Sequence, residues 1–297
     1  MSIPTTTSPP RPPSTTPART ARTPKTSANG GTVEMRTDGA APRGLRIVLN
    51  AVEGWGKTSL AAYGPEPAIL MAHGETGYET LLAHDRVPRV PRATVASWEG
   101  LLAFVREQSG ECPYQLLALD AMGGMERLCH AHVCTRDFKG DWGEKGFMGY
   151  QRGYEVAVAD WLQLLQALDA LATEGMHVLL LGHVQVRPFK NPLGDDYDRF
   201  VGDLHPKTAA PTFRWADAVL FGTFRTILDD SHGKARPKGI GGQDRVLFTE
   251  HHDAYDAKNR LGMPAEIKVP NDPTRLWQTI TDAIGTHPVS KETQSNA

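Results

Sequence analysis

Residues 50–60 read N-A-V-E-G-W-G-K-T-S-L. An apolar run, residues 45–49, precedes this stretch, and residues that favour helix, 59–63, continue it. A buried strand, a glycine-containing loop and a helix in this order are typical of a P-loop, which binds phosphates. Gly54 and Gly56 let the loop turn its backbone N–H groups inward around an anion, with the N-terminus of the next helix behind them.

The loop predicts the ligand as well as the local fold. Lys57 is expected to reach the β- and γ-phosphates, and the Thr58 hydroxyl is expected to hold Mg²⁺. The predicted nucleotide-binding residues are Ala51, Val52, Glu53, Gly54, Trp55, Gly56, Lys57, Thr58 and Ser59. Ala51 departs from the motif G-x-x-x-x-G-K-[ST], because it adds a methyl group where the turn can require a positive φ. The expected ligands are ATP and Mg²⁺, and the motif does not say which reaction follows.

Composition limits the class of protein. The chain has 297 residues, 40% hydrophobic and 22% charged, which suits one or two globular domains with a full core. Its net charge is -2, so any nucleic-acid binding has to come from local basic patches. Three cysteines without a secretory signal predict a reducing, cytoplasmic location. No apolar run approaches membrane-spanning length, so no membrane association is expected.

Three segments are predicted along the chain. Residues 1–43 are rich in Pro, Thr and Ser and predict a disordered, weakly basic tail. Residues 44–284 predict one P-loop NTPase domain, and residues 285–297 predict a polar C-terminal tail. For the first tail, an electrostatic tether to nucleic acid is an alternative to a solvated segment without a role.

Strands alternate with helices inside the predicted domain. Strands are expected at residues 45–49, 67–71, 92–95, 114–119, 177–181, 217–224 and 245–249, and helices at 97–108, 122–134, 154–175 and 273–284. A long loop is expected over residues 184–212. This alternation predicts a mainly parallel, doubly wound α/β sheet, in which ligands bind at the carboxyl ends of the strands.

Three polar side chains follow later strands and are expected beside the P-loop. Asp120 ends the run L-L-A-L-D and is expected to bind Mg²⁺ through water, although an Asp there can also cap the next helix. Glu75 is expected to orient and activate water, with Glu79 as a competitor for that role. His183 ends V-L-L-L-G-H and is expected either to sense the γ-phosphate or simply to form a hydrogen bond.

These motifs resemble those of phage and prophage P-loop ATPases of the shortened RecA type, which belong to the AAA family. The resemblance covers about residues 44–264 and implies a RecA-like core; some members are ATP-dependent single-strand annealing recombinases. H-G-E-T-G looks like the second-strand motif of this family, which places Glu75 on the catalytic glutamate, although His73 replaces the usual Asp. L-L-A-L-D-A-M resembles the Walker B segment, and G-H-V resembles the polar end of the following core strand.

The resemblance also implies partners. A-K-N-R-L-G-M-P, residues 257–264, is similar to a basic stretch of RecA that contacts the ATP of a neighbouring subunit. Lys258 and Arg260 are therefore candidates for catalysis in trans in a homo-oligomer, a filament or a ring; the alternative is a solvated basic turn. Two loops, 136–149 and 185–213, are candidates for binding single-stranded DNA because they combine basic and aromatic residues. Both also carry acids, so a substrate lid without nucleic acid stays open.

The predicted function is ATP hydrolysis coupled to single-stranded DNA binding in recombination or annealing. Two alternatives stay open, a nucleotide-dependent switch that holds a protein partner and a P-loop kinase of a small substrate. A kinase usually needs arginines in a short lid over the phosphates, whereas this chain continues into a late strand region.

Overall fold

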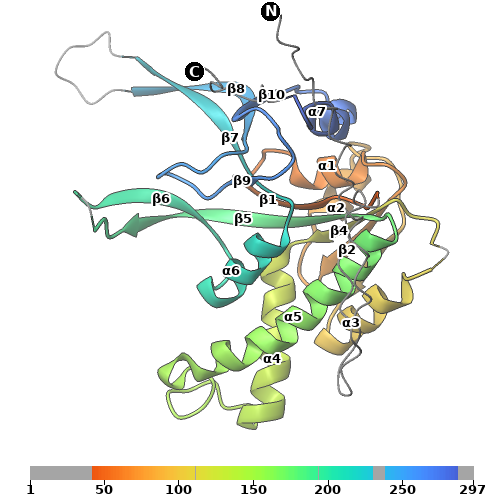
Figure 1. The fold of residues 1–297 in the computed structure, drawn as a ribbon, viewed down its shortest axis with the longest axis vertical. Helices are drawn as coiled ribbons and strands as arrows, with labels where there is room; N and C mark the ends of the chain where they lie inside the picture. The colour runs from red at the N-terminus through yellow and green to blue at the C-terminus, as the bar shows by residue number, and fades with distance from the viewer. Residues whose placement is uncertain (1–41, 111, 193, 230–237, 287–297) are drawn as a thin grey trace, which may run out of the picture. The chain divides into compact units, whose positions relative to one another are not determined.

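The computed structural model describes residues 42–110, 112–192, 194–229 and 238–286. The predicted tails, 1–43 and 285–297, lie almost wholly outside the described residues. A mixed sheet forms the framework of the described part, in the strand order β10-β8-β7-β1-β5-β4-β2-β3 (Figure 1). None of the described helices is both long enough and apolar enough to cross a membrane.

Parallel strands form the half of the sheet that carries the P-loop. They are β1 (Arg46–Ala51), β2 (Pro67–Ala72), β3 (Arg92–Val95), β4 (Leu116–Asp120), β5 (His177–Phe189) and β7 (Ala218–Asp229). β1 and β4 are buried along their whole length, as their apolar runs predict. β5 lies between β1 and β4, so His183 is brought to an edge between the P-loop and Asp120.

Helices cover both faces of this sheet (Figure 1). One face carries α1 (Lys57–Ala62), α2 (Gly77–Ala83) and α7 (Leu276–Asp282), the last preceded by the 3₁₀ turn η2 (Pro273–Arg275). The other face carries α3 (Trp98–Glu107), α4 (Met122–Phe138), α5 (Arg152–Thr173, preceded by the 3₁₀ turn η1, Gly149–Gln151) and α6 (Pro206–Trp215). The predicted mainly parallel, doubly wound α/β sheet is confirmed, and its RecA-like type stays a prediction.

The prediction of a long loop over residues 184–212 is wrong. β5 continues to Phe189 and pairs antiparallel with β6 (Tyr197–Gly202), and α6 then begins at Pro206. The hairpin lies outside the main core, with half-buried and exposed side chains, so it lacks the continuous apolar run that marks a buried strand. Proline at the first position of α6 favours a helix start, because its missing N–H has no partner there in any case.

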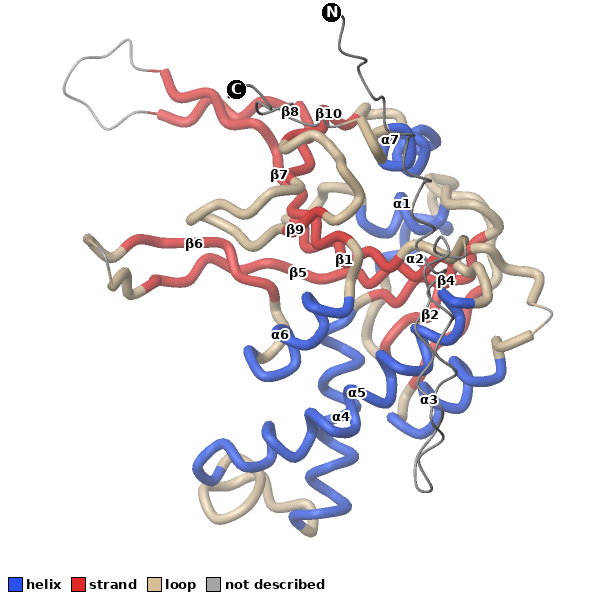
Figure 2. The backbone as a smooth tube through the Cα atoms, in the orientation of Figure 1, coloured by secondary structure: helices blue, strands red, loops and turns tan. Residues whose placement is uncertain are grey.

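The opposite end of the sheet is antiparallel. β8 (Lys238–Phe248) pairs with β7 and with β10 (Glu266–Val269), and β9 (Lys258–Asn259) also pairs with β7. The strands predicted at 217–224 and 245–249 are present and extend further than predicted. Figure 2 shows β5–β6 and β7–β8 as two ribbons that reach beyond the helices.

Candidate nucleotide site

The loop after β1 has the conformation that its glycines predict. Gly54 has φ 73° and Gly56 has φ 111°, both in the left-handed region that favours glycine. Gly56 is also the N-cap residue of α1, which begins at Lys57. The N–H of Trp55 donates to the carbonyl of Val52 at 3.3 Å and closes the turn. The loop therefore curls tightly between the end of β1 and the start of α1.

Ala51 fits its position because a glycine faces it on the neighbouring strand. Ala51 is the last residue of β1, fully buried and in register with Gly222 of β7. A Cβ atom on Gly222 would lie 2.9 Å from the Cβ of Ala51 and 2.7 Å from the Trp55 ring. The methyl group that departs from the P-loop motif is thus accommodated by the absence of a side chain at 222.

Trp55 anchors the loop rather than facing a ligand. Its side chain is fully buried, and its Nε1–H donates to the carbonyl of Val246 in β8 at 3.1 Å. Trp55 is one of the predicted nucleotide-binding residues, and only its backbone is therefore available to a nucleotide. This bond also fixes the distance between the P-loop and β8.

Lys57 lies across the loop. Its Nζ donates to the carbonyls of Ala51 at 2.7 Å and Val52 at 3.3 Å, and the residue is only 8% exposed. Burial lowers the pKa of Lys57, and the nearby carboxylates of Asp120, Asp203 and others oppose this effect. A nucleotide phosphate would give this partly desolvated ammonium the negative partner that two carbonyls supply only in part.

Thr58 and Asp120 are joined directly. The Thr58 hydroxyl donates to Oδ2 of Asp120 at 2.8 Å. Burial raises the pKa of Asp120, while the Thr58 hydrogen bond and the charges of His183 and Lys57 lower it. Two oxygen groups beside a phosphate loop suit Mg²⁺, which is usually held by few protein ligands together with phosphates and water. Among the described residues, no cluster of three or more His, Cys, Asp or Glu side chains could hold a metal alone.

Glu75 and His183 lie together beside Asp120. The Nε2 of His183 is 4.0 Å from Oε2 of Glu75, and both side chains are partly exposed. The charge of Glu75 acts on Asp120 and Lys57, which places all four groups at one edge. Glu79, the competing glutamate, is instead bonded to Arg92 at 2.5 Å. Of the two glutamates, only Glu75 belongs to this group of side chains.

Asp203 is a further residue of this site that the sequence analysis does not identify. It follows β6, and its backbone N–H donates to the carbonyl of His183 at 3.0 Å. Its carboxylate lies against Gly123 at the start of α4, where a Cβ atom would come within 2.0 Å of Oδ2. Burial raises the pKa of Asp203, and its Oδ1 has no hydrogen-bond partner in the described part of the chain. Because the sequence predicts a loop over residues 184–212, no sequence pattern places Asp203 beside His183.

Lys258 and Arg260 lie at the C-terminal end of α6, away from the P-loop cavity. The Nζ of Lys258 donates to the carbonyls of Phe213 and Ala216, each at 2.6 Å, at the C-terminal end of α6. The Nη1 of Arg260 donates to the carbonyl of Arg214 at 3.3 Å. Neither side chain lines the cavity at the P-loop of its own chain. Lys258 thus stabilises the end of α6, and a contact of either residue with a neighbouring subunit stays a prediction.

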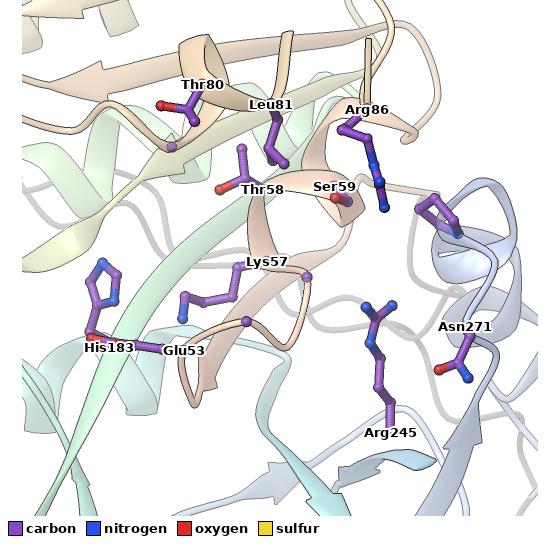
Figure 3. Close-up of a pocket in the computed structure, with 14 residues that line it drawn as sticks. Glu53, Lys57, Thr58, Ser59, Thr80, Leu81, Arg86, His183, Arg245 and Asn271 are labelled. Carbon is purple, nitrogen blue, oxygen red and sulfur yellow. The ribbon is translucent and has the colours of Figure 1, made fainter. Parts of the chain in front are cut away.

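A cavity of about 540 Å³ opens over the P-loop. This volume is within the usual range for small-molecule sites. Figure 3 shows Lys57, His183 and Glu53 at one end and Arg86, Arg245 and Asn271 at the other. The full lining is Glu53, Gly54, Gly56, Lys57, Thr58, Ser59, Gly77, Thr80, Leu81, Arg86, His183, Arg245, Asn271 and Pro273.

The family model described as AAA domain matches residues 43–261. The chain belongs to this AAA-domain family. No curated protein matches the sequence. Among solved structures, the chain is similar to the flagellar accessory protein FlaH from Methanocaldococcus jannaschii, with 11% identity and a TM-score of 0.40 over 77% of this chain and 85% of that chain.

The AAA domain contains every residue predicted to act in catalysis. Lys57, Glu75, Asp120 and His183 lie inside the matched range, as do Lys258 and Arg260. The match ends before η2 and α7, which begin at Pro273 and cover the side of the P-loop. The chain is thus a P-loop nucleotide-binding protein of the AAA-domain family, and part of its cavity comes from outside the matched residues.

Proposed function

We propose that this AAA domain binds Mg²⁺-ATP and hydrolyses it. The observation that carries the proposal is the 2.8 Å bond between Thr58 and Asp120, at the sheet edge that also carries Glu75 and His183. Lys57 would exchange its carbonyl partners for the β- and γ-phosphates, and Thr58 and Asp120 would hold Mg²⁺. When bound, Mg²⁺ supplies positive charge that neutralises the phosphate oxygens.

Glu75 is proposed to act on the attacking water. A carboxylate at this place can accept a proton from water as the oxygen attacks the γ-phosphate. His183 lies 4.0 Å from Glu75 and can orient it, and its position in β5 next to β1 keeps it beside the phosphates. The chain therefore provides a phosphate-binding cation, two metal-binding oxygens and a base, which is the set that ATP hydrolysis needs.

We also propose that the β5–β6 hairpin binds single-stranded DNA. Arg187 lies directly opposite Arg199 in the hairpin register, and like charges in that arrangement repel. Arg199 is bonded to Asp256 at 2.7 Å, whereas Arg187 has no bonded acid among the described residues. The rings of Phe189 and Tyr197 lie 5.2 Å apart at the end of the same ribbon. A free cation beside aromatic rings suits a strand that offers phosphates and unpaired bases.

The first predicted DNA loop, residues 136–149, supports this proposal less well. Arg136 is bonded to both Asp137 and Asp160, at 2.7 and 2.8 Å. Phe147, one of the aromatic residues that made this loop a candidate, is fully buried and is not available to stack on bases. Trp142, which is 42% exposed, is the aromatic side chain of this loop that remains accessible.

The proposed DNA ribbon is connected to the nucleotide site through one strand. β5 runs from the buried sheet through His183 into the hairpin, and Asp203 at the end of β6 returns to the carbonyl of His183. A change at the γ-phosphate that moves His183 would therefore act at the base of the ribbon. This connection supports coupling of ATP turnover to DNA binding. A role in recombination or annealing and assembly of several copies along a strand are further parts of the proposal.

One observation favours the alternative of a nucleotide-dependent switch for a protein partner. Lys190 is bonded to Asp196 at 2.5 Å, and Lys207 is bonded to Glu155. These acids reduce the positive charge of residues 185–213, the segment that the sequence predicts to bind DNA. A binding switch with little turnover therefore stays the second candidate, and a cytoplasmic location, which the three unpaired cysteines support, suits both.

The two candidates differ in what single-stranded DNA does to turnover. We expect DNA to raise the steady-state ATPase rate of the full chain, and Arg187→Ala to weaken DNA binding and reduce its salt dependence by about 0.7 in log–log slope, the value for one phosphate contact. Arg106→Ala, on the distant exposed face of α3, is the matched control and should change neither. An absence of DNA binding, with DNA-independent turnover, would support the switch.

A further inference from the structure

Two arginines occupy the end of the cavity farthest from His183. Arg86 follows α2, Arg245 belongs to β8, and Asn271 precedes η2. Figure 3 shows the guanidinium groups of Arg86 and Arg245 pointing toward one another across the cavity, with Asn271 beside Arg245. None of these residues belongs to the P-loop motif or to the catalytic groups described above.

Arg245 is held in place by its neighbours in β8. The carbonyl of Val246, the next residue, accepts the bond from Trp55 of the P-loop. The Nη1 of Arg245 accordingly lies 3.5 Å from the point that a Cβ on Gly56 would occupy. Its Nε is buried without a hydrogen-bond partner among the described residues. Its place beside the loop therefore follows from backbone structure rather than from a salt bridge.

The two guanidinium groups lack counter-charges. In the described part of the chain, no acid is bonded to Arg86 or Arg245, and the only carboxylate that lines the cavity is that of Glu53, at the Lys57 end (Figure 3). Two like charges that face one another across a cavity are unfavourable unless something lies between them. A flat aromatic group is one suitable occupant, because guanidinium planes stack on aromatic faces.

The P-loop sets the direction of a bound nucleotide. Lys57 marks the phosphate end, and Ser59 lies between it and the two arginines, Arg86 and Arg245 (Figure 3). The sugar and base of a nucleotide with its phosphates at Lys57 must extend this way. Leu81 and Pro273 give this end apolar walls, and the Asn271 amide offers both a donor and an acceptor to the edge of a base.

We propose that Arg86 and Arg245 clamp the nucleoside half of the bound nucleotide, with the base between their guanidinium groups and Asn271 at its edge. This proposal rests on the proposed function, because it needs the phosphates at Lys57. It makes Arg245 a nucleotide-binding residue supplied by the same chain, distinct from any cation of a neighbouring subunit.

Affinities for three ligands test the clamp. We would measure dissociation constants of the full chain for ATP, ADP and inorganic tripolyphosphate, each with Mg²⁺, for wild type, Arg245→Ala and Arg86→Ala. Each variant should weaken ATP and ADP alike, by about tenfold, because both ligands share the nucleoside. Tripolyphosphate binding should not change. Arg225→Ala, an exposed arginine of β7 that is bonded to Glu266, is the control and should alter none of the three.

Other results would overturn the clamp. Unchanged ATP affinity in both variants would rule out the clamp. A loss of tripolyphosphate affinity equal to the loss of ATP affinity would show that the arginines bind the phosphates instead. Arg86 is exposed, so its variant keeps the test open if Arg245→Ala fails to fold. If wild type binds tripolyphosphate as tightly as ATP, the nucleoside adds no affinity. The clamp then fails while the P-loop assignment holds. If wild type binds neither ATP nor tripolyphosphate, the proposed function fails and the clamp with it.

Discussion

The two ends of the cavity are built in different ways. The phosphate end comes mainly from one short segment, whose lining residues are Glu53, Gly54, Gly56, Lys57, Thr58 and Ser59. Asp120 at the end of β4 and His183 within β5 lie beside this segment. The nucleoside end comes from Arg86, Arg245 and Asn271, which lie far apart in the sequence. Phosphates are alike in all nucleotides and can be held by one local backbone shape, whereas a base and sugar need side chains collected from several elements.

The largest expected effect is on the chemistry at the phosphate end. Glu75→Gln should keep ATP affinity and lower the rate of hydrolysis by up to about 10⁴-fold, since an amide can hold water but cannot accept its proton. Single-turnover ATP hydrolysis measures this rate. Glu79→Gln is the matched control, because Glu79 is bonded to Arg92 on the surface. Turnover that survives in Glu75→Gln and disappears in Glu79→Gln would assign the base to the other glutamate.

The second effect concerns a residue that a neighbouring subunit would add to the phosphate end. If Arg260 acts in trans, Arg260→Ala should still fold and bind ATP but lose about 10³-fold in DNA-stimulated turnover. Mixing it with Lys57→Ala subunits should restore some activity, because each supplies what the other lacks. Lys258→Ala should instead lower the melting temperature, since Lys258 holds the carbonyls at the end of α6. Near-normal turnover of Arg260→Ala without rescue would make this segment a solvated basic turn.

The smallest effect is a difference in pH dependence between the two ends. Burial raises the pKa of Asp120 and lowers the pKa of Lys57, so Mg²⁺-ATP affinity should fall on both the acid and the alkaline side. Protonation removes the carboxylate that holds Mg²⁺ as pH falls through the raised pKa of Asp120. Deprotonation removes the phosphate-binding charge as pH rises through the lowered pKa of Lys57.

Variants of each end should affect this pH profile differently. Asp120→Asn should flatten the acid side of an affinity-versus-pH curve, because the group proposed to hold Mg²⁺ can then no longer be protonated. Arg245→Ala should lower the whole curve without changing its shape, since an arginine keeps its charge over this range. A change of shape in Arg245→Ala would show that the two ends are electrostatically coupled.

The same contrast explains what the sequence could predict. The P-loop, Asp120 and Glu75 follow buried apolar strands, so local patterns located them, and the sheet brought them together. The β5–β6 hairpin could not be predicted, because its strands have no continuous apolar face. Arg245 could not be predicted as a cavity residue, because its position depends on the bond between Trp55 and Val246, 191 residues apart.

Ala51 shows how a departure from a motif can be compensated at a distance. Its methyl group occupies space that Gly222 of β7 leaves free, and only the strand register brings these two residues together. Glycine is therefore required at 222 in this chain, since a side chain there would meet both Ala51 and Trp55. The P-loop motif alone does not show whether the Ala51 methyl group fits, because the motif does not include Gly222.

One titration tests the central claim that this cavity holds Mg²⁺-ATP with its phosphates at Lys57. Binding of ATP to the full chain would be measured by calorimetry with Mg²⁺, for wild type and for Lys57→Ala. The account predicts binding to wild type and a loss of about 100-fold or more in Lys57→Ala, because a charge-assisted contact to the phosphates is removed. Equal ATP affinity in a folded Lys57→Ala variant would contradict the assignment of the P-loop as the nucleotide site.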